Sequence, residues 1–466
     1  MNVPHFTLPI LPLLRPTFST PTDNRFLVLL FGALLTTGRR PITNLLRTVR
    51  HPAPGHGSSY PRVVSPRRWS TWVMARALIR CWRDPVVPPG PVLLAGDDTV
   101  TAHPGPKVFG KGRHRDGVRS SHRYTAYRWG PQGVVVSGLV KRPVARRSWA
   151  LPVLVAWYRP PAWDREHGTR HKTPAHCARR LRARLIRWFP PRHFIFVGDM
   201  GYGTSETARL CQQHRRHLTI VSKFYGDAAL YEPPPLRTCH TMGRPRVKGQ
   251  NPASPHEVVA NTSERTSLTV AWYGGTTRAI EIVTGTGHWY RMGEDLVDVR
   301  WGYVHDCTGT HRDESFLTTA ITMKPQRMVA CDTPRGSIET TFQDCREDLK
   351  LESTHGDGPH TVLRFTPCLF GLYTMVVLLY LQLPRSSSTL SAIFWRGKST
   401  GTFSDMLTCV RRALWAEWCV HTAADLRQCS KLSPSFQDTI LSALAPAASR
   451  AGEVMSQARI SLPWAI

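Results

Sequence analysis

The chain lacks the paired cysteines of a disulfide framework or a zinc site. Its eleven cysteines are scattered along 466 residues, with no Cys-x-x-Cys pair and no cluster of cysteine and histidine at zinc-ligand spacing. Cys177 lies near His171 and His176, but no second half of a zinc site follows. We therefore expect reduced core thiols, as in a cytoplasmic protein, and no structural zinc.

Long hydrophobic runs are also scarce, and none has the form of a secretion signal. The N-terminus, MNVPHFTLPILPLLRP, is broken by prolines and has no small-residue cleavage site. The apolar run Phe26–Leu35 is too short to span a bilayer. Phe365–Leu383 is long enough, but Pro367, Gly371 and a polar end interrupt it. We interpret it as a buried helix, with a membrane-associated basic protein as the alternative, and we expect no membrane partner.

Acidic residues are few: 32 Asp and Glu stand against 61 Lys and Arg, a formal net charge of +29. This excess is spread over the whole chain and attracts polyanions. A GC-rich genome would explain Arg in place of Lys, but not the excess of bases over acids. Because Lys and Arg supply most non-specific affinity for phosphates, double-stranded DNA is the expected partner, and we expect a cytoplasmic, nucleoid-associated protein.

The first 90 residues contain no strand pattern. Residues 1–25 are rich in Pro and Thr and are expected to be disordered. Residues 26–90 have helical periodicity, as in the basic amphipathic segment RRWSTWVMARALIRCW. We predict a helical N-terminal DNA-binding region here, with a helical cap packed on the core as the alternative.

Residues 91–215 change to the pattern of strands. The apolar runs VLLAGDD, VVVSGLV and ALPVLVAWYR precede the basic helical segment TPAHCARRLRARLIRWFP and the buried-strand run FIFVGD. The order of three strands, a helix and a strand is that of the ribonuclease-H-like fold. We therefore predict an α/β fold with a ribonuclease-H-like mixed sheet flanked by helices.

A β-rich insertion is predicted at residues 216–310. There SLTVAWYGG, RAIEIVTGTG and DLVDVRWGYVHD alternate like strands. The core is expected to resume at 311–385, and residues 386–466 are expected to form a C-terminal helical region.

The stretch Pro334–Leu351, PRGSIETTFQDCREDLKL, has the period of a helix, and Pro334 suits its first position. An apolar stripe consists of Ile338, Phe342, Cys345 and Leu349. A charged set on one side consists of Arg335, Glu339, Arg346 and Lys350. Glu339 thus lies among cations, and a salt-bridged surface residue is its simplest interpretation.

Two upstream aspartates favour a second interpretation of Glu339. Asp97 and Asp199 follow apolar runs, and function gathers at strand ends in open α/β sheets. Two Asp and one Glu suffice to bind two Mg²⁺ (or Mn²⁺) ions for phosphodiester chemistry. We predict that Asp97 bridges both ions while Asp199 and Glu339 each serve one. Asp98 is a rival to Asp97, since neighbours on a strand point to opposite faces.

These motifs together resemble the DDE transposases of bacterial insertion sequences, in the branch with a β-rich insertion before the Glu. The resemblance covers about residues 26–420 and rests on DDT at 97–99, VGDMGYG at 197–203 and RGSIETTFQDCR. The last matches an Arg-x3-Glu-x6-Lys signature at Arg335 and Glu339, with Arg346 in the Lys place and Asp332 where the signature has Tyr.

The resemblance implies a metal-dependent endonuclease and DNA strand transferase that acts at element ends as a homodimer on DNA. It favours Asp97 over Asp98 as the first ligand, because Asp97 keeps Thr99 at the family spacing. Two other functions fit the same residues: a decayed copy that binds DNA without cutting it, and a structure-selective nuclease of the same fold.

Further residues are predicted to contact DNA. They are Lys107, Lys111 and Arg113 of a Gly-rich basic loop, Arg335, Arg346 and Lys350 of the Glu339 helix, and Trp301. The loop would clamp DNA near Asp97, with a solvated charged segment as the alternative, and the helix cations would hold phosphates. Trp301 would stack on a flipped base, although a core tryptophan is the simpler interpretation.

Overall fold

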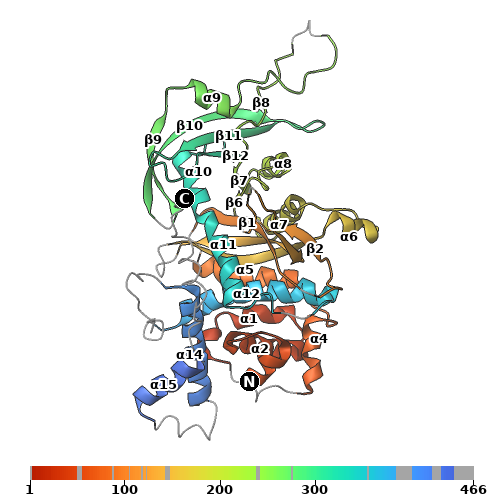
Figure 1. Ribbon diagram of the computed structural model, residues 1–466, viewed down its shortest axis with the longest axis vertical. Helices are drawn as coiled ribbons and strands as arrows, with labels where there is room; N and C mark the ends of the chain where they lie inside the picture. The colour runs from red at the N-terminus through yellow and green to blue at the C-terminus, as the bar shows by residue number, and fades with distance from the viewer. Residues whose placement is uncertain are drawn as a thin grey trace, which may run out of the picture. The chain divides into compact units, whose positions relative to one another are not determined.

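The computed structural model describes residues 3–49, 55–86, 89–103, 105–116, 119–121, 123–141, 147–237, 242–273, 276–353, 356–384, 401–421 and 432–445. The chain divides into two compact units (Figure 1). The sheet unit comprises Val64–Gln343 and His355–Thr374, and the helical unit comprises Met1–Val63, Asp344–Thr354 and Met375–Ile466. Within the described ranges, all strands lie in the sheet unit.

Ten strands of the sheet unit form one mixed sheet in the order β5-β4-β1-β6-β7-β12-β11-β10-β8, with β9 paired to β10 (Figure 1). They are β1 (Val92–Val100), β4 (Gln132–Val140), β5 (Trp149–Tyr158), β6 (Phe194–Gly198), β7 (Leu218–Lys223), β8 (Leu230–Tyr231), β9 (Thr266–Ala271), β10 (Thr277–Trp289), β11 (Val297–His305) and β12 (Glu314–Thr318). A separate ribbon pairs β2 (Gly112–Arg115) with β3 (Tyr127–Gly130).

Helices connect and cover this sheet. They are α5 (Thr71–Val86), α6 (Pro161–Glu166), α7 (Pro174–Trp188), α8 (Ser205–Gln213), α9 (Pro255–Asn261), α10 (Pro325–Asp332) and the first parts of α11 (Ser337–Glu347) and α12 (Pro359–Gln382). The chain runs from β5 through α7 to β6 and through α8 to β7, so each helix is the crossover that two parallel strands need.

The first five strands confirm the predicted ribonuclease-H-like mixed sheet flanked by helices. β4 is antiparallel to both β1 and β5, whereas β1, β6 and β7 run parallel. The parallel strands β6 and β7 are almost continuously buried because helices cover the sheet.

The strands of the predicted insertion extend this same sheet. β12 pairs antiparallel with β7, with Phe316 opposite Lys223, and β11, β10 and β9 continue the antiparallel pairing outward. β7 is the fifth strand of the core although it lies inside the interval 216–310, and β12 lies beyond that interval. The core and the insertion therefore share one continuous sheet.

The sheet separates two apolar clusters because side chains alternate between its faces. One cluster contains Val197 of β6 together with Met328 of α10. The other contains Leu317 of β12 together with Ala208 of α8. Helix α10 and helix α8 therefore cover opposite faces, and this division decides which strand-end residues can meet.

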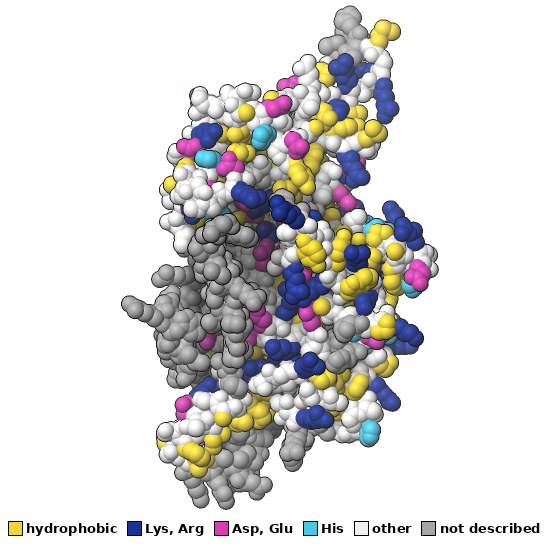
Figure 2. All heavy atoms as spheres, in the orientation of Figure 1, with side chains coloured by type: hydrophobic (Ala, Val, Ile, Leu, Met, Phe, Trp, Pro, Cys, Tyr) yellow, Lys and Arg dark blue, Asp and Glu magenta, His cyan; other side chains and the backbone are white. Residues whose placement is uncertain are grey.

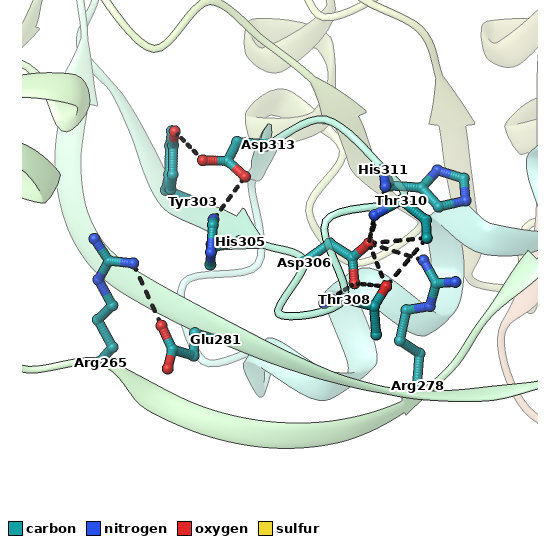
Figure 3. Close-up of polar contacts among 10 residues, drawn as sticks. All are labelled: Arg265, Arg278, Glu281, Tyr303, His305, Asp306, Thr308, Thr310, His311 and Asp313. Carbon is teal, nitrogen blue, oxygen red and sulfur yellow. Dashed lines mark hydrogen bonds and ion pairs between the residues drawn. The ribbon is translucent and has the colours of Figure 1, made fainter.

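A buried carboxylate organises the turn between β11 and β12 (Figure 3). Asp306 accepts hydrogen bonds from the backbone N–H groups of Thr308, Thr310 and His311 at 2.9–3.2 Å. Arg278 of β10 pairs with the same carboxylate at 3.0 Å. Its hydrogen-bonding capacity is met within the turn, so we assign it a structural role.

The helical unit contains α2 (Thr20–Leu35), α3 (Ile42–Val49), α14 (Phe403–His421) and α15 (Pro434–Leu444). Buried Arg40 and Arg411 donate hydrogen bonds to carbonyl groups at the C-terminal end of α2, including Thr36 O at 3.0 and 2.9 Å. These guanidinium groups satisfy carbonyls that a helix end leaves without partners.

The described N-terminal residues 3–25 differ from the expected disordered tail. They form η1 (His5–Thr7), α1 (Leu11–Leu14), η2 (Arg15–Thr17) and the first turn of α2. Leu11 and Leu14 are buried. The prediction of disorder rested on the Pro/Thr-rich composition. It did not consider the spacing of Leu11 and Leu14, which places both on one side of a short helix, where they are buried.

The stretch predicted as one helix from Pro334 to Leu351 is shorter and broken. Pro334 lies in a 3₁₀ turn, η5 (Thr333–Gly336), and α11 begins at Ser337. Lys350, with φ of 52°, adopts the left-handed conformation, and Leu351 N–H donates to Cys345 O at 3.0 Å. This hydrogen-bond pattern is one that closes helix ends.

Helix α12 is, among the described residues, the one helix long and apolar enough to cross a membrane. About two thirds of its most apolar window, 67%, is buried inside the molecule. Thr374 donates to Pro152 O of β5 at 2.7 Å. These contacts agree with the interpretation of this segment as a buried helix.

Candidate active site

Asp97 and Asp199 belong to two neighbouring parallel strands: Asp97 lies within β1, three residues before the strand ends at Val100, and Asp199 directly follows the end of β6 at Gly198. β1 and β6 pair in register from Val92 opposite Phe194 to Ala95 opposite Val197. Each aspartate comes two residues after the last of these pairs, so the two lie at the same level along the strands, where β6 has ended and β1 continues beside β4. The strand register thus brings together residues that are about a hundred positions apart.

Strand alternation separates Asp97 from its neighbour Asp98. Asp97 is four residues after Leu93, so the two side chains lie on the same face of β1. Leu93 packs against the apolar cluster that contains Met328 of α10, and Asp97 therefore lies on the face that α10 covers. Asp98 lies on the opposite face, where it accepts hydrogen bonds from Gln132 Nε2 and, at 3.4 Å, from Tyr202 Oη. This arrangement supports Asp97 rather than Asp98 as the predicted first ligand.

The glycine that precedes the two aspartates has a packing role. A Cβ on Gly96 would lie 2.2 Å from Cζ of Phe196. Phe196 is fully buried, and the Arg182 guanidinium lies 4.3 Å from its ring centroid. The sequence AGDD therefore lets β1 lie close to the Phe196 ring, immediately before the residues that carry the site.

The segment GDMGYG forms the turn that presents Asp199. The N–H groups of Tyr202 and Gly203 donate to the Asp199 carbonyl at 3.1 Å, and Ser222 Oγ of β7 donates to it at 2.7 Å. A Cβ on Gly203 would lie 2.6 Å from Lys223 O. The glycine at this position therefore lets the turn pack against β7 and fixes the backbone of Asp199.

Arg335 is the cation that the acidic residues share. Its Nη1 lies 3.6 Å from Glu339 Oε1, and its Nε lies 3.8 Å from Asp332 Oδ1. Burial lowers the pKa of Arg335, but the charges of Asp332, Asp97, Glu339 and Asp199 raise it above its ordinary value. The three predicted metal ligands therefore act on one guanidinium.

Burial also perturbs the carboxylates. Burial, together with the charges of Asp98 and Asp199, raises the pKa of Asp97 to about 7, although the hydrogen bond from the Asp98 N–H and the charge of Arg335 oppose the change. Burial raises the pKa of Asp98 as well. A nearby cation stabilises the charged form of a carboxyl group. Additional positive charge would therefore stabilise the ionised forms of Asp97 and Asp98.

The donor set fits a divalent metal ion. Carboxylate oxygens are the hard ligands that Mg²⁺ prefers, and Asp97 is a buried carboxyl group whose charge lacks full compensation. Glu339, in contrast, is 64% exposed, and its carboxylate pairs with Arg335 instead of lying beside the two aspartates in a metal site. Among the residues that the structure describes, no three His, Cys, Asp or Glu side chains are placed to hold a metal ion together. Metal binding by all three carboxylates would therefore require Glu339 to leave Arg335.

The remaining predicted DNA contacts divide into two groups. Lys107 and Arg113 are exposed, and Lys111 donates to Gly105 O at 2.8 Å, so this basic segment lies on the surface of the sheet unit. Arg346 and Lys350 belong to the helical unit, where Arg346 pairs with Glu352 at 3.4 Å.

Trp301 is a correction to the predicted DNA contacts. Its side chain is only 5% exposed and lies in the cluster with Leu317 and Ala208. A Cβ on Gly285, opposite Trp301 on β10, would lie 2.5 Å from the indole ring. The ring therefore fills the core next to a glycine and is not available to stack on a base.

Asp332, which stands where the resembled signature has Tyr, is also a residue of the site. It is buried, pairs with Arg335 and accepts a hydrogen bond from Tyr273 Oη at 3.3 Å. Burial raises its pKa to about 6. The signal that could have identified it is its position three residues before Arg335, the spacing of a helical ion pair.

Comparison with solved structures finds a similarity to the one described as "Cryo-EM structure of piggyBac transposase synaptic complex with hairpin DNA (SNHP)". The sequence identity is 10% and the TM-score is 0.41, over 99% of this chain and 90% of that chain. A search of curated proteins finds no match.

Comparison with protein families gives a match over residues 13–279 to the family described as DDE superfamily endonuclease. The matched span contains Asp97 and Asp199 and ends before Glu339. Because it covers more than half of the 466 residues, the chain belongs to the DDE superfamily endonucleases.

Proposed function

We propose that this chain is a transposase that cuts DNA at the ends of a bacterial insertion sequence and joins those ends to target DNA. One observation carries the proposal. Asp97 and Asp199 occupy equivalent positions on neighbouring strands of a DDE-family chain, and both act with Glu339 on the same guanidinium. The charges of three carboxylates from distant parts of the sequence thus act on one cation.

Each residue has a distinct role in this proposal. Asp97, Asp199 and Glu339 would hold two Mg²⁺ or Mn²⁺ ions, which would supply Lewis-acid activation of the attacking oxygen and stabilisation of the leaving oxygen. Asp97 must be deprotonated to do so. Arg335, released from Glu339, would donate hydrogen bonds to a phosphate of the bound strand.

DNA would be held by the positive charge of the chain. Lys107, Lys111 and Arg113 would contact phosphates of the bound DNA, as would Arg346 and Lys350 of the helical unit and the N-terminal helical region. We propose terminal repeats and target DNA as the two substrates, a homodimer on DNA as the active form, and the cytoplasmic nucleoid as the location.

The experiment is a cleavage and joining assay with a labelled duplex that carries the element end and a plasmid target. Wild type is expected to nick the duplex in Mg²⁺ or Mn²⁺, but not in EDTA, and to produce labelled plasmid. Asp199→Asn and Glu339→Gln are expected to lose nicking by at least about a hundredfold while they retain DNA binding. Undiminished nicking by either variant would contradict the proposed ligand set.

The products also separate the alternatives. Nicking without labelled plasmid would indicate a structure-selective nuclease, which the endonuclease family description equally supports. A decayed copy is favoured by the exposed pairing of Glu339 with Arg335. Such a copy would bind DNA with a steep dependence on salt and would cut under no metal condition.

A further inference from the structure

The β2–β3 ribbon displays one exposed face that is both basic and aromatic. Its register places Arg113 opposite Trp129 and Arg115 opposite Tyr127, so these four side chains share a face. Trp129 is 56% exposed and Tyr127 is 49% exposed, and Tyr124, just before β3, is 67% exposed. Large aromatic side chains are seldom left this open to solvent without a partner.

The opposite face of the ribbon is packed. A Cβ on Gly112 would lie 2.2 Å from Cγ of Pro160, and one on Gly130 would lie 1.9 Å from Thr101 O. The His114 ring lies 5.9 Å from the Tyr158 ring, edge to face. The ribbon is therefore fixed to the sheet unit by this face, and the aromatic face is its permanent outer surface.

Cations are interleaved with the rings on the outer face. The Arg113 guanidinium lies 3.6 Å from the Tyr127 ring centroid, and Lys111 Nζ lies 5.9 Å from that of Trp129. From residue 107 to residue 130 the sequence contains one acid, Asp116, and its carboxylate accepts from the N–H of Arg119 at 3.2 Å. Residues 107–130 thus offer positive charge and π surfaces with Asp116 as their single acid.

The space-filling view agrees with this composition. Figure 2 shows Lys and Arg side chains interleaved with hydrophobic ones over the part of the sheet unit where Figure 1 places β2, α6 and α7. A surface of this kind matches a polyanion that also carries flat apolar rings. Nucleic acid is the polymer with both properties.

We propose that the outer face of the β2–β3 ribbon binds an unpaired DNA strand, with Trp129 and Tyr127 as base-stacking platforms and Arg113, Arg115 and Lys111 as phosphate contacts. This inference deepens the proposed function and rests on it for the identity of the polymer. In a duplex the bases stack on one another and phosphates alone face outward, so cations would suffice. Exposed aromatic rings gain a partner when bases are unstacked, and every base has a face to offer.

The position of the ribbon suits a strand that leaves the carboxylates. His103 N–H donates to Trp129 O at 3.2 Å, which places Trp129 beside a residue six positions past Asp97. At about 3.3 Å per residue these six residues, which continue past the end of β1 at Val100, span at most about 20 Å. At about 3.4 Å per stacked nucleotide this corresponds to about six nucleotides.

The test is equilibrium binding by fluorescence anisotropy in EDTA, with labelled oligo-deoxythymidine of about 15 nucleotides and a duplex of equal length. Trp129→Ala and Tyr127→Ala are expected to weaken single-strand binding about 5- to 100-fold and duplex binding less than about twofold. Trp129→Phe keeps a ring and is expected to restore most of the single-strand affinity. Tyr225→Ala removes another exposed tyrosine, 65% exposed, and is the matched control with no expected change.

A second readout locates the strand directly. Ultraviolet crosslinking with 5-iododeoxyuridine in the oligonucleotide is expected to modify the peptide that contains Tyr127 and Trp129. The proposal is overturned if Trp129→Ala leaves single-strand affinity unchanged, if it weakens duplex and single strand equally, or if crosslinks fall elsewhere. Because EDTA prevents metal-dependent cleavage, failure here leaves the proposed chemistry standing, whereas retained nicking by Asp199→Asn would contradict the chemistry and leave the ribbon standing.

Discussion

Arg335 Nη1 lies 3.6 Å from Glu339 Oε1, one helical turn away. The charges of Asp97 and Asp199 also raise the pKa of this guanidinium. Arg335 thus provides the positive charge among carboxylates that we propose to hold divalent ions. Each ion carries twice the charge of a guanidinium, so metal binding and the Arg335–Glu339 pair compete for the same oxygens.

Arg335→Gln should tighten the binding of Mn²⁺ to the DNA-free protein by about tenfold, because it removes a neighbouring positive charge without removing a ligand. Titration of free Mn²⁺ by electron paramagnetic resonance measures this affinity. Arg335→Lys keeps the charge and is the matched control, with affinity close to that of wild type. Weaker Mn²⁺ binding by Arg335→Gln would show that Arg335 positions the ligands and does not compete with the metal.

The stability of the metal-free protein should depend on pH through Asp97. Its pKa is about 7 in the folded state and about 3.9 when unfolded. Between these values the folded state holds the proton more tightly, so the contribution of this group to stability falls as pH rises from about 4 to about 7. Asn does not ionise, so Asp97→Asn removes this pH-dependent loss of stability. The free energy of unfolding of the variant should therefore exceed that of wild type by about 1–3 kcal/mol at pH 8.

Urea denaturation in EDTA at pH 4 and pH 8 measures this difference. At pH 4 the variant and wild type should differ little, because Asp97 is already protonated in the folded state. Asp332, whose pKa is about 6, retains a similar dependence in both proteins. An equal gain at both pH values would assign the effect to packing and contradict the electrostatic account.

Gly96→Ala should destabilise the protein by about 1–3 kcal/mol, because the added methyl group meets the buried ring of Phe196. It should also lower nicking activity, since β1 must shift at the residue before Asp97. Gly336→Ala is the matched control: its Cβ meets nothing within 4 Å, and no loss of stability is expected. Differential scanning calorimetry compares the two, and equal melting temperatures would contradict the packing role of Gly96.

Much of the fold follows from hydrophobic periodicity. The runs that end at Asp97 and Asp199 form buried strands, and the order of strands and helices predicts the mixed sheet. The continuity of the sheet through β12 was not predictable, because alternation identifies a strand but not its neighbour. Disorder was wrongly predicted for residues 3–25, because composition alone contains no information about the spacing of Leu11 and Leu14.

The sequence identified candidate residues for the site, but it did not predict how most of them are arranged in space. Strand alternation indicated that Asp97 and Asp98 lie on opposite faces, and the structure places Asp97 on the face that α10 covers and Asp98 on the other face. The pairing of Glu339 with Arg335 was foreseen as the simpler interpretation of that helix. The burial of Trp301 depends on Gly285 of a neighbouring strand, a contact that no local pattern contains. The aromatic face of the ribbon depends on cross-strand register in the same way.

The comparison of Asp97→Asn with Asp98→Asn in a plasmid nicking assay tests the central claim most directly. The two substitutions are chemically identical and adjacent, but they lie on opposite faces of β1. We predict that Asp97→Asn loses at least about a hundredfold of the Mg²⁺-dependent nicking rate while Asp98→Asn retains most of it, with duplex binding unchanged in both. Retained nicking in Asp97→Asn, or selective loss in Asp98→Asn, would contradict the assignment of the site.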